Sequence, residues 1–568
     1  MTISRYTTPV SYQYRTCAKT FVHPFVLFGY KCVPSQYIIK GELIMKPTAR
    51  ITVPYAVANY VEMRERGFYY VDKTKFISQL ELYKAPVFLR PRRFGKSLLC
   101  STLAAYYDLN CGTLRGAVTA DARYARLFKD FRFSDEKNAP KMLEDILSYV
   151  LDHKLPPVYI LIDEYDNFTN QLLTAFKDPL YEQVTTADSF LCTFFKIIKK
   201  GIGEGSVRTC FCTGVLPVTM DDLTSGYNIA EILTLKPNFL NMLGFTHAET
   251  EVYLRYVLRK YAGTEERFEE VWKLIVSNYD GYRFHSDAEP LFNSTILTYF
   301  LKNFAETATV PEEMIDENLR TDINWIRRLA LNLENVQEML NALVIEDGMP
   351  YAQPDLRSKF NKQKFFDKNF YPVSLFYLGM TTLNNAFRMV LPNLTMRSIY
   401  MDYYNQLNNI DNYANRYVPA FEQFTHDRNM EGIFRNYYEQ YLGQFPAQIF
   451  DKMNENFIRC SFFELCSRYL SQCYTFALEQ NHPAGRSDFE MTGIPGTEYY
   501  KDHRIVEFKY FTAGEDKKVL PLTAPRPEDV EQVKQYAETI RAQFPYYHIR
   551  LYVVYVVSSK GYRFFEVE

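Results

Sequence analysis

The sequence lacks the paired cysteines and histidines of structural metal sites and the long apolar runs of membrane spans. Histidine occurs 8 times in 568 residues, and the 10 cysteines include no CxxC pair. This pattern argues against a structural zinc site and predicts buried free thiols in a reducing cytoplasm. No window approaches the roughly 20 apolar residues of a membrane-spanning helix. The net charge is only −2, so any nucleic-acid site must be local rather than a global basic field.

What the sequence does contain is the composition of a folded chain. Hydrophobic residues make up 47% and charged residues 23%, which excludes a disordered or collagen-like protein. The length predicts roughly three or four domains. Regular patterning begins near Met45, so residues 1–44 are interpreted as an N-terminal extension, with Met45 as an alternative start.

The order of the apolar runs divides the remaining chain. Residues 45–245 alternate short apolar runs with amphipathic stretches, which predicts a parallel α/β core. Residues 246–304 have a helical pattern, and residues 305–450 are mostly helical with one hairpin expected within 374–393. The last segment, 451–568, predicts a helix followed by strands, a second helix and further strands. The middle segment is expected to pack between two domains, with a winged-helix module as the alternative.

A phosphate-binding loop is indicated where a predicted strand at residues 85–90 meets a predicted helix at 96–103. The intervening RPRRFGKS departs from the pattern GxxxxGK[ST], because Arg90 stands at the first glycine and Pro91 offers no N–H. The second half of the loop keeps its chemistry. Gly95 permits the turn, and the amides up to Ser97 point at a phosphate in front of the helix dipole.

Each residue of this loop has an expected role toward a nucleotide. Lys96 is predicted to reach the β and γ phosphates, and the Ser97 hydroxyl to hold Mg²⁺. Arg92 and Arg93 are candidates for direct phosphate contact, with a solvated arginine pair as the alternative. The candidate nucleotide-binding residues of the loop are Arg92, Arg93, Phe94, Gly95, Lys96 and Ser97.

Two later strands end in residues suited to the same site. The apolar run 158–162 delivers Asp163 and Glu164 at its carboxyl end, where open α/β sheets place ligand chemistry. This arrangement resembles a Walker B strand, in which Asp163 would hold Mg²⁺ and Glu164 would orient the attacking water. The run 207–214 carries Thr213, whose hydroxyl is placed to sense the γ phosphate. A strand that simply ends in a charged or capping residue is the structural alternative for both.

A second group of catalytic residue types lies near the C-terminus. Asp488 precedes a Gly/Pro turn, and Glu507 and Lys509 follow it on one face of a predicted strand, because strand side chains alternate. In this D…ExK arrangement the two carboxylates would hold Mg²⁺, and Lys509 would position water or stabilise the transition state.

Four segments together resemble a known family. FLRPRRFGKSL, ILIDEYDNF, TGVLPVTMDDLTSGYNI and YDGYRF are similar to signature segments of bacterial AAA-ATPase-like proteins with a C-terminal PD-(D/E)XK nuclease-like domain. The resemblance begins near Ala56, and the Arg-Pro of the loop is typical of that family. It implies a P-loop ATPase core at 45–245 that binds ATP, a helical lid at 246–304 and a nuclease-like α/β domain at 451–568.

The resemblance also suggests supporting residues. Gln532 and Tyr536, one helical turn apart, resemble the QxxxY pair of exonuclease-type members, which orients substrate or the catalytic lysine. Glu464 is a candidate further metal carboxylate, with a solvated helical residue as the alternative. Arg283 is a candidate lid arginine that senses phosphate, with a structural arginine as the alternative.

One departure from the family concerns residues 110–157, where such a core normally places a strong apolar strand. Only residues 128–133 are a weak candidate for it. A deletion in this stretch would weaken the ATPase.

The sequence therefore predicts an ATP-binding protein, an ATPase that uses Mg²⁺, coupled to a Mg²⁺-dependent domain that cleaves nucleic acid, with DNA the expected partner. The alternative is a nucleotide-controlled switch or scaffold whose nuclease fold no longer cuts, and a third is an ATPase with a structural C-terminal module. The complete set of Asp488, Glu507 and Lys509 favours the first. A cytoplasmic location without membrane contact is expected, and a homo-oligomer is left open.

Overall fold

The computed structural model describes most of the chain as two compact units. The described residues are 6–7, 51–107, 131–135, 137–186, 189–223, 226–311, 314, 336–346, 348–385, 387–483 and 485–568. One unit is Met1–Leu243 with Phe360–Lys362, and the other is Gly244–Lys359 with Gln363–Glu568. Within these stretches no helix combines the length and apolar character needed to cross a membrane. Most of the expected extension, residues 1–5 and 8–44, lies outside the described residues.

The first unit is built on a sheet with the strand order β1-β3-β4-β2-β5. Its strands are β1 (Tyr6–Thr7), β2 (Pro86–Leu89), β3 (Val158–Ile162), β4 (Val207–Gly214) and β5 (Glu231–Ile232). All pairs are parallel except β1 with β3. Because β2 and β3 both pair with β4, the carboxyl ends of these three strands lie side by side. Every residue of β2 and β3 is buried, as continuous apolar runs predict for parallel strands.

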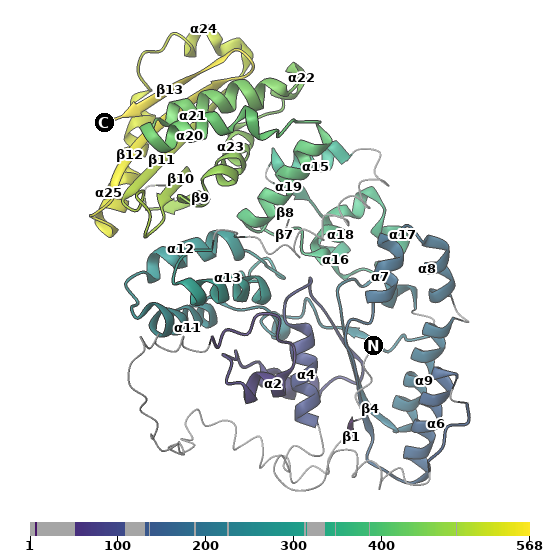
Figure 1. The fold of residues 1–568 in the computed structure, drawn as a ribbon. Helices are drawn as coiled ribbons and strands as arrows, with labels where there is room; N and C mark the ends of the chain where they lie inside the picture. Colours follow the sequence, from purple (N-terminus) through teal and green to yellow (C-terminus); the bar gives the residue numbers. More distant parts are fainter. Residues whose placement is uncertain are drawn as a thin grey trace, which may run out of the picture. The chain divides into compact units, whose positions relative to one another are not determined.

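Helices cover both faces of this sheet. They are α2 (Tyr60–Glu65), α3 (Ile77–Leu80), α4 (Lys96–Tyr107), α6 (Ala139–Asp152), α7 (Asn167–Thr174), α8 (Asp178–Thr185), α9 (Phe190–Glu204) and α10 (Val218–Asp222). Helices α2 and α4 lie on one side of β4, and α6 and α9 on the other (Figure 1). This confirms the α/β class.

The strand that a core of this family normally places between α4 and β3 is not found in the described part of that stretch. Residues 131–133 of the weak candidate have no strand structure, and residues 128–130 lie outside the described residues. This agrees with the sequence analysis, which found no strong apolar strand in this stretch. On this side of the sheet β3 instead pairs with β1, which comes from the N-terminal segment.

The second unit begins with helices. Those of the expected lid are α11 (His247–Val257), α12 (Phe268–Tyr279) and α13 (Ser294–Thr307). The middle region holds α15 (Val336–Val344), α16 (Gln353–Arg357), α17 (Lys362–Phe365), α18 (Tyr371–Leu378), α19 (Leu394–Leu407), α20 (Val418–Asp427), α21 (Met430–Asn436) and α22 (Ala447–Phe450). The middle of the chain is thus helical, as predicted.

The hairpin expected within residues 374–393 is present. It consists of β7 (Thr382–Leu383) and β8 (Arg388–Val390), and β6 (Met349–Pro350) pairs with β8. Helix α18 precedes it and α19 follows. The alternative interpretation of this segment as a winged-helix module stays a prediction.

The C-terminal part of the second unit is a mixed sheet in the order β13-β12-β11-β10-β9. Its elements are α23 (Glu455–Leu470), β9 (Tyr474–His482), β10 (Gly485–Gly493), β11 (Asp502–Phe511), α24 (Asp516–Val519), α25 (Pro527–Gln543), β12 (His548–Val557) and β13 (Gly561–Val567). Strands β11 and β12 are parallel and the other neighbours antiparallel.

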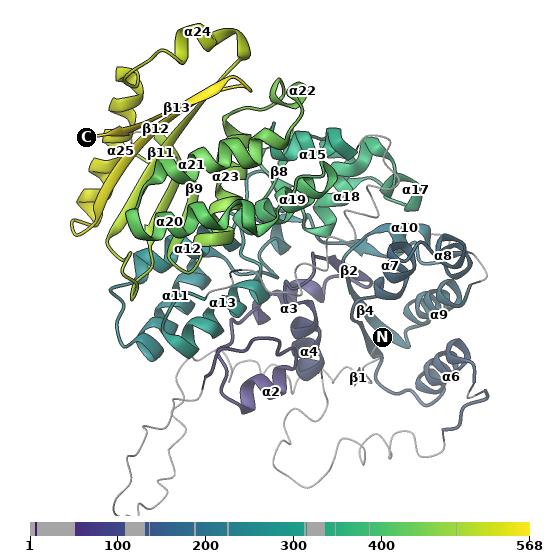
Figure 2. The same ribbon diagram turned by 45° about the horizontal axis from the view of Figure 1, so that its top comes forward.

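Two helices cover opposite faces of this sheet, as Figure 2 shows for α23 and α25. On one face Ile505 joins the core that includes Val533 and Tyr536 of α25. On the other face Phe508 packs against Phe462 of α23, with ring centroids 5.8 Å apart. Side chains alternate along β11, so this packing assigns each residue of the strand to a face.

The turn that follows α12 depends on a glycine. Gly281 has φ +101°, and a Cβ there would lie 2.0 Å from the carbonyl oxygen of Pro392. We expect Gly281→Ala to unfold the second unit at lower urea concentration, because overpacking costs about 1–3 kcal/mol beyond the backbone strain.

Gly263 provides the matched control for that urea titration. It also has a positive φ, +71°, but nothing lies within 4 Å of the position that a Cβ would take there. Gly263→Ala should show only the strain of a positive φ, about 1 kcal/mol. Equal shifts in the two variants would contradict the close approach of Gly281 to Pro392.

Candidate functional site

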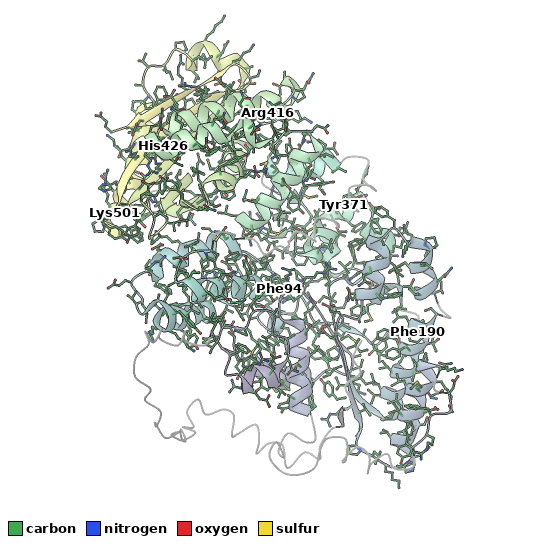
Figure 3. The ribbon with its side chains drawn as sticks, in the orientation of Figure 1. Phe94, Phe190, Tyr371, Arg416, His426 and Lys501 are labelled. Carbon is green, nitrogen blue, oxygen red and sulfur yellow. The ribbon has the colours of Figure 1, made fainter. Side chains whose placement is uncertain are left out.

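The loop between β2 and α4 has the geometry of a phosphate-binding turn. Gly95 has φ +87°, which a side chain would disfavour, and α4 begins at the next residue. Phe94, labelled in Figure 3, is buried with 1% exposure and anchors the loop. Arg92 and Ser97 are partly buried beside it. Arg93 is partly buried too and has φ +72°, so a second residue of this short loop is in a left-handed conformation.

Arg90, at the position of the first glycine, faces inward. Its guanidinium donates to the carbonyl oxygens of Leu89 at 3.1 Å, Thr234 at 3.0 Å and Leu240 at 2.9 Å. The group also lies 4.5 Å from the ring centroid of Phe88. Arg90 therefore ties β2 to the segment after β5, and this structural role accounts for the departure from the glycine pattern.

Lys96 is buried at the start of α4. Its Nζ donates to the carbonyl oxygens of Arg90 at 3.0 Å and Pro91 at 2.8 Å. Burial lowers the pKa of this lysine, while the carboxylates of Glu164 and Asp166 act in the opposite direction. The ammonium group thus lies under the loop, within electrostatic reach of the acidic residues that follow β3.

Asp163, Glu164 and Thr213 meet where β3 and β4 end. The Thr213 hydroxyl donates to Asp163 Oδ1 at 2.6 Å and accepts from the backbone N–H of Glu164 at 3.2 Å. Glu164 has φ +50°, an uncommon conformation that is often found at functional sites. The structure thus brings together three residues that the sequence placed on separate strands.

Asp166 is a residue of this region that sequence reasoning missed. It is fully buried, and its carboxylate accepts from the backbone N–H groups of Val215 at 3.0 Å and Leu216 at 2.7 Å and from Asn170 Nδ2 at 2.8 Å. Burial raises the pKa of Asp166, and these donors counteract it. The side chain fixes the loop after β4 to the turn after β3. The third acidic residue of IDEYDNF was the available signal.

Arg283 belongs to the second unit, in the turn between α12 and α13. Its backbone N–H donates to Thr382 Oγ1 at 2.6 Å. The nearby Asp280 holds His247 Nε2 at 2.6 Å. The role of Arg283 toward a nucleotide stays a prediction.

Asp488 and Glu507 lie level with each other on adjacent strands. Strands β10 and β11 are antiparallel, and Phe489 pairs with Val506. Asp488, one residue before Phe489, therefore lies beside Glu507, one residue after Val506. Both carboxylates are buried, with 7% and 2% exposure. Asp488 Oδ2 accepts the backbone N–H of Phe508 at 2.8 Å.

Two cations lie against this carboxylate pair. Lys509 Nζ is 2.8 Å from Glu507 Oε1, and Arg459 Nη1 of α23 is 3.1 Å from Asp488 Oδ1. Burial lowers the pKa of Lys509, but the charge and hydrogen bond of Glu507, together with the charges of Glu455 and Asp488, raise it above its usual value. Arg459 is a second residue that the sequence did not indicate.

The electrostatics of the pair fit a divalent cation. Glu507 Oε2 is buried without a hydrogen-bond partner. Burial, followed by repulsion from Asp488, raises the pKa of Glu507 to about 7. A cation beside these oxygens would relieve both costs. Among the residues that the structure describes, no group of three or more His, Cys, Asp or Glu side chains could hold a metal ion, so water or phosphate oxygens would complete the ligand set.

Helix α23 brings Glu455, which the sequence did not indicate, within electrostatic reach of Lys509 and Asp488. Glu464 is buried in an ion pair with Arg468, whose Nε lies 3.1 Å from Glu464 Oε1. Glu455, in the first turn of the helix, accepts the backbone N–H of Tyr510 at 3.4 Å. Burial raises the pKa of Glu455, and Lys509 opposes that shift. The role of Glu464 as a further metal carboxylate stays a prediction.

Gln532 and Tyr536 form the expected helical pair. Gln532 Nε2 donates to the Tyr536 hydroxyl at 2.6 Å, and that hydroxyl donates to the carbonyl oxygen of Arg486 at 2.9 Å. Burial raises the pKa of Tyr536, and the charge of Glu507 raises it further. The pair thus lies within electrostatic reach of the carboxylates and anchors the start of β10.

Comparison with known proteins gives two family matches. Residues 54–117 and 113–224 match the model of the predicted AAA-ATPase family, and residues 453–566 match the PD-(D/E)XK nuclease superfamily. An uncharacterized protein in the vnfD 5' region of Azotobacter chroococcum mcd 1 is 41% identical over 238 residues. The match covers 36% of this chain and 45% of that relative, less than half its length. No solved structure matches the chain.

The contacts of Asp166 predict its effect on the first unit. The substitution Asp166→Asn replaces one acceptor oxygen by an NH₂ group, which would face N–H donors that it cannot satisfy. We therefore expect the free energy of unfolding to fall by about 2 kcal/mol. Thermal unfolding compared with Asp152→Asn, an exposed position on α6, measures it. Coinciding curves for the two variants would show that the buried carboxylate does not fix this loop.

Proposed function

We propose that nucleotide binding in the N-terminal domain controls metal-dependent cleavage of nucleic-acid phosphodiesters by the C-terminal domain. The chain carries a predicted AAA-ATPase-like domain and a PD-(D/E)XK nuclease superfamily domain in that order. The observation that carries the proposal is the buried pair of Asp488 and Glu507 with Lys509 against it. DNA is the proposed substrate and ATP the proposed nucleotide.

In the nuclease-like domain the proposal gives each residue a distinct task. Asp488 and Glu507 hold Mg²⁺, which when bound polarises the scissile phosphate and lowers the pKa of a coordinated water. Lys509 donates a charged hydrogen bond to the oxygen that becomes more negative in the transition state. Tyr536 holds the start of β10 through its bond to the carbonyl of Arg486.

In the ATPase-like domain the tasks follow the strand ends. Lys96 releases its two carbonyl partners and contacts the β and γ phosphates, and Arg92 and Arg93 add phosphate contacts. Ser97 and Asp163 hold Mg²⁺, with Thr213 fixing the Asp163 carboxylate. Glu164 orients the attacking water.

The second candidate is a nucleotide-controlled switch or scaffold that binds nucleic acid without cutting it. One observation favours it: both oxygens of Asp488 already have donors, Arg459 Nη1 and the backbone N–H of Phe508. Cleavage requires that a metal share this carboxylate with Arg459, whereas a scaffold does not. A cleavage assay separates the two functions.

The nuclease assignment predicts that Lys509→Ala cuts DNA at least about 100-fold more slowly than the native protein, because one transition-state donor is lost. Linear and supercoiled DNA would be incubated with Mg²⁺ or Mn²⁺, with and without ATP, and a parallel assay would use RNA. Lys518→Ala, at an exposed position of α24, is the control and should cut normally. A native protein that binds DNA but cuts neither nucleic acid would favour the scaffold.

The nucleotide assignment predicts that Lys96→Ala binds ATP at least about tenfold more weakly, since a charged hydrogen bond is worth about 1.5–3 kcal/mol. Titration of a fluorescent ATP analogue measures the affinity, with Lys84→Ala, an exposed lysine before β2, as the control. The same variant should lose any response of DNA cleavage to ATP. Unchanged affinity in Lys96→Ala would remove this loop from the nucleotide site.

A further inference from the structure

Three arginines from three elements converge on one carboxylate beside the candidate nuclease site. Arg459 Nη2 of α23 and Arg486 Nη1 of β10 each lie 2.8 Å from Glu479 Oε1, and Arg397 Nη2 of α19 lies 3.3 Å from Glu479 Oε2. We call Arg397, Arg459, Arg486 and Glu479 the arginine cluster.

Arg459 connects the arginine cluster to the candidate metal site. Besides Glu479 it contacts Asp488, at 3.1 Å. Two arginines of the cluster are largely buried, with side-chain exposures of 11% for Arg397 and 13% for Arg459. A metal bound at Asp488 would compete with Arg459 for that carboxylate. The guanidinium group of Arg459 would then have a donor to offer to a second anion.

The backbone at the centre of the cluster is unusual. Glu479 has φ +51° inside β9, a left-handed conformation that costs energy for any residue other than glycine. The recorded pairs of β9 and β10 on either side are Leu478 with Phe489 and Gln480 with Ser487, and Glu479 and Asp488 between them are not paired. The irregularity therefore coincides with the point where the cluster meets the candidate metal site.

The guanidinium groups are held in place before any ligand arrives. Asn456 Oδ1 accepts from Arg459 Nε at 3.2 Å and Nη2 at 3.0 Å, and lies 3.5 Å from Arg397 Nη1. In contrast, the side chain of Arg486 is 55% exposed. A ligand can therefore reach the cluster from solvent at Arg486. Because Arg397 and Arg459 are already held in place, their side chains would lose little conformational freedom when the ligand binds.

We propose that the arginine cluster binds a phosphate group of the nucleic-acid strand, next to the phosphate that is cut. The inference rests on the proposed function, because it assigns the substrate contact of that same site. Guanidinium forks match phosphate oxygens in geometry, whereas the compact charge of lysine does not. The phosphate is either an internal phosphodiester or a terminal 5′-phosphate, which share the same chemistry.

The test measures binding without cleavage. Anisotropy of a fluorescein-labelled single-stranded DNA oligonucleotide would be followed in EDTA at salt concentrations between about 50 and 200 mM. We expect Arg486→Gln to bind about tenfold more weakly and to lower the slope of log affinity against log salt by about 0.7, the value for one lost phosphate contact. The control is Arg563→Gln, exposed on β13 at the opposite edge of the sheet, which should match the native protein.

A second variant distinguishes an anion site from a structural ion network. Glu479→Gln keeps the size and an acceptor oxygen but removes the competing negative charge, so an anion site should bind the oligonucleotide several-fold more tightly. A structural network would weaken in both Glu479→Gln and Arg486→Gln. Oligonucleotides with a 5′-phosphate or a 5′-hydroxyl tell the two sources apart, because only a terminal-phosphate site discriminates between them.

The outcomes separate this inference from the proposed function. Arg486→Gln binding as tightly as the native protein, or Glu479→Gln binding more weakly, overturns the phosphate site even if the protein cuts DNA. A protein that never cuts, yet shows the expected changes in both variants, upholds the phosphate site and overturns cleavage. A native protein without affinity for DNA or RNA overturns both.

Discussion

Both candidate sites depend on buried carboxylates that lie within strands or directly after them. Removing a charge from water costs several kcal/mol unless donors or cations lie close to it. Asp166 is satisfied by backbone and amide donors, and Asp488 by Arg459 and a backbone N–H. Glu507 has only one satisfied oxygen and a pKa raised to about 7. Unlike Asp166 and Asp488, Glu507 therefore keeps an oxygen that a ligand could contact.

Strand pairing places these groups. In the first unit β4 lies between β2 and β3, so the phosphate loop and Asp163 reach the same edge of the sheet, with Thr213 joining them. In the second unit the register of β10 with β11 places Asp488 beside Glu507. Neither arrangement needs a long loop to position a side chain. Sites on strands hold their geometry more closely than sites on loops, which suits phosphoryl chemistry.

The sequence predicted what depends on local pattern and missed what depends on docking. The strand ends at Asp163 and the alternation of β11 followed from apolar periodicity alone. The sequence could not show which glutamate of α23 lies near the candidate metal site. Glu455 and Glu464 are about two and a half helical turns apart and so lie on opposite faces of the helix. Only the packing of the helix decides which face meets the strands. From the sequence, Arg90 was only a departure from the phosphate-loop pattern. Its structural role could not be predicted, because its partners Thr234 and Leu240 lie more than a hundred residues later in the chain.

The expected lid and the candidate nuclease site share one packed unit. Helix α12 packs against β9, the strand that carries Glu479, and Lys273 of α12 lies 3.1 Å from Gln543 at the end of α25. Packed interiors transmit displacements because they contain little free volume. A displacement of α12 would therefore reach β9 directly, and with it the arginine cluster.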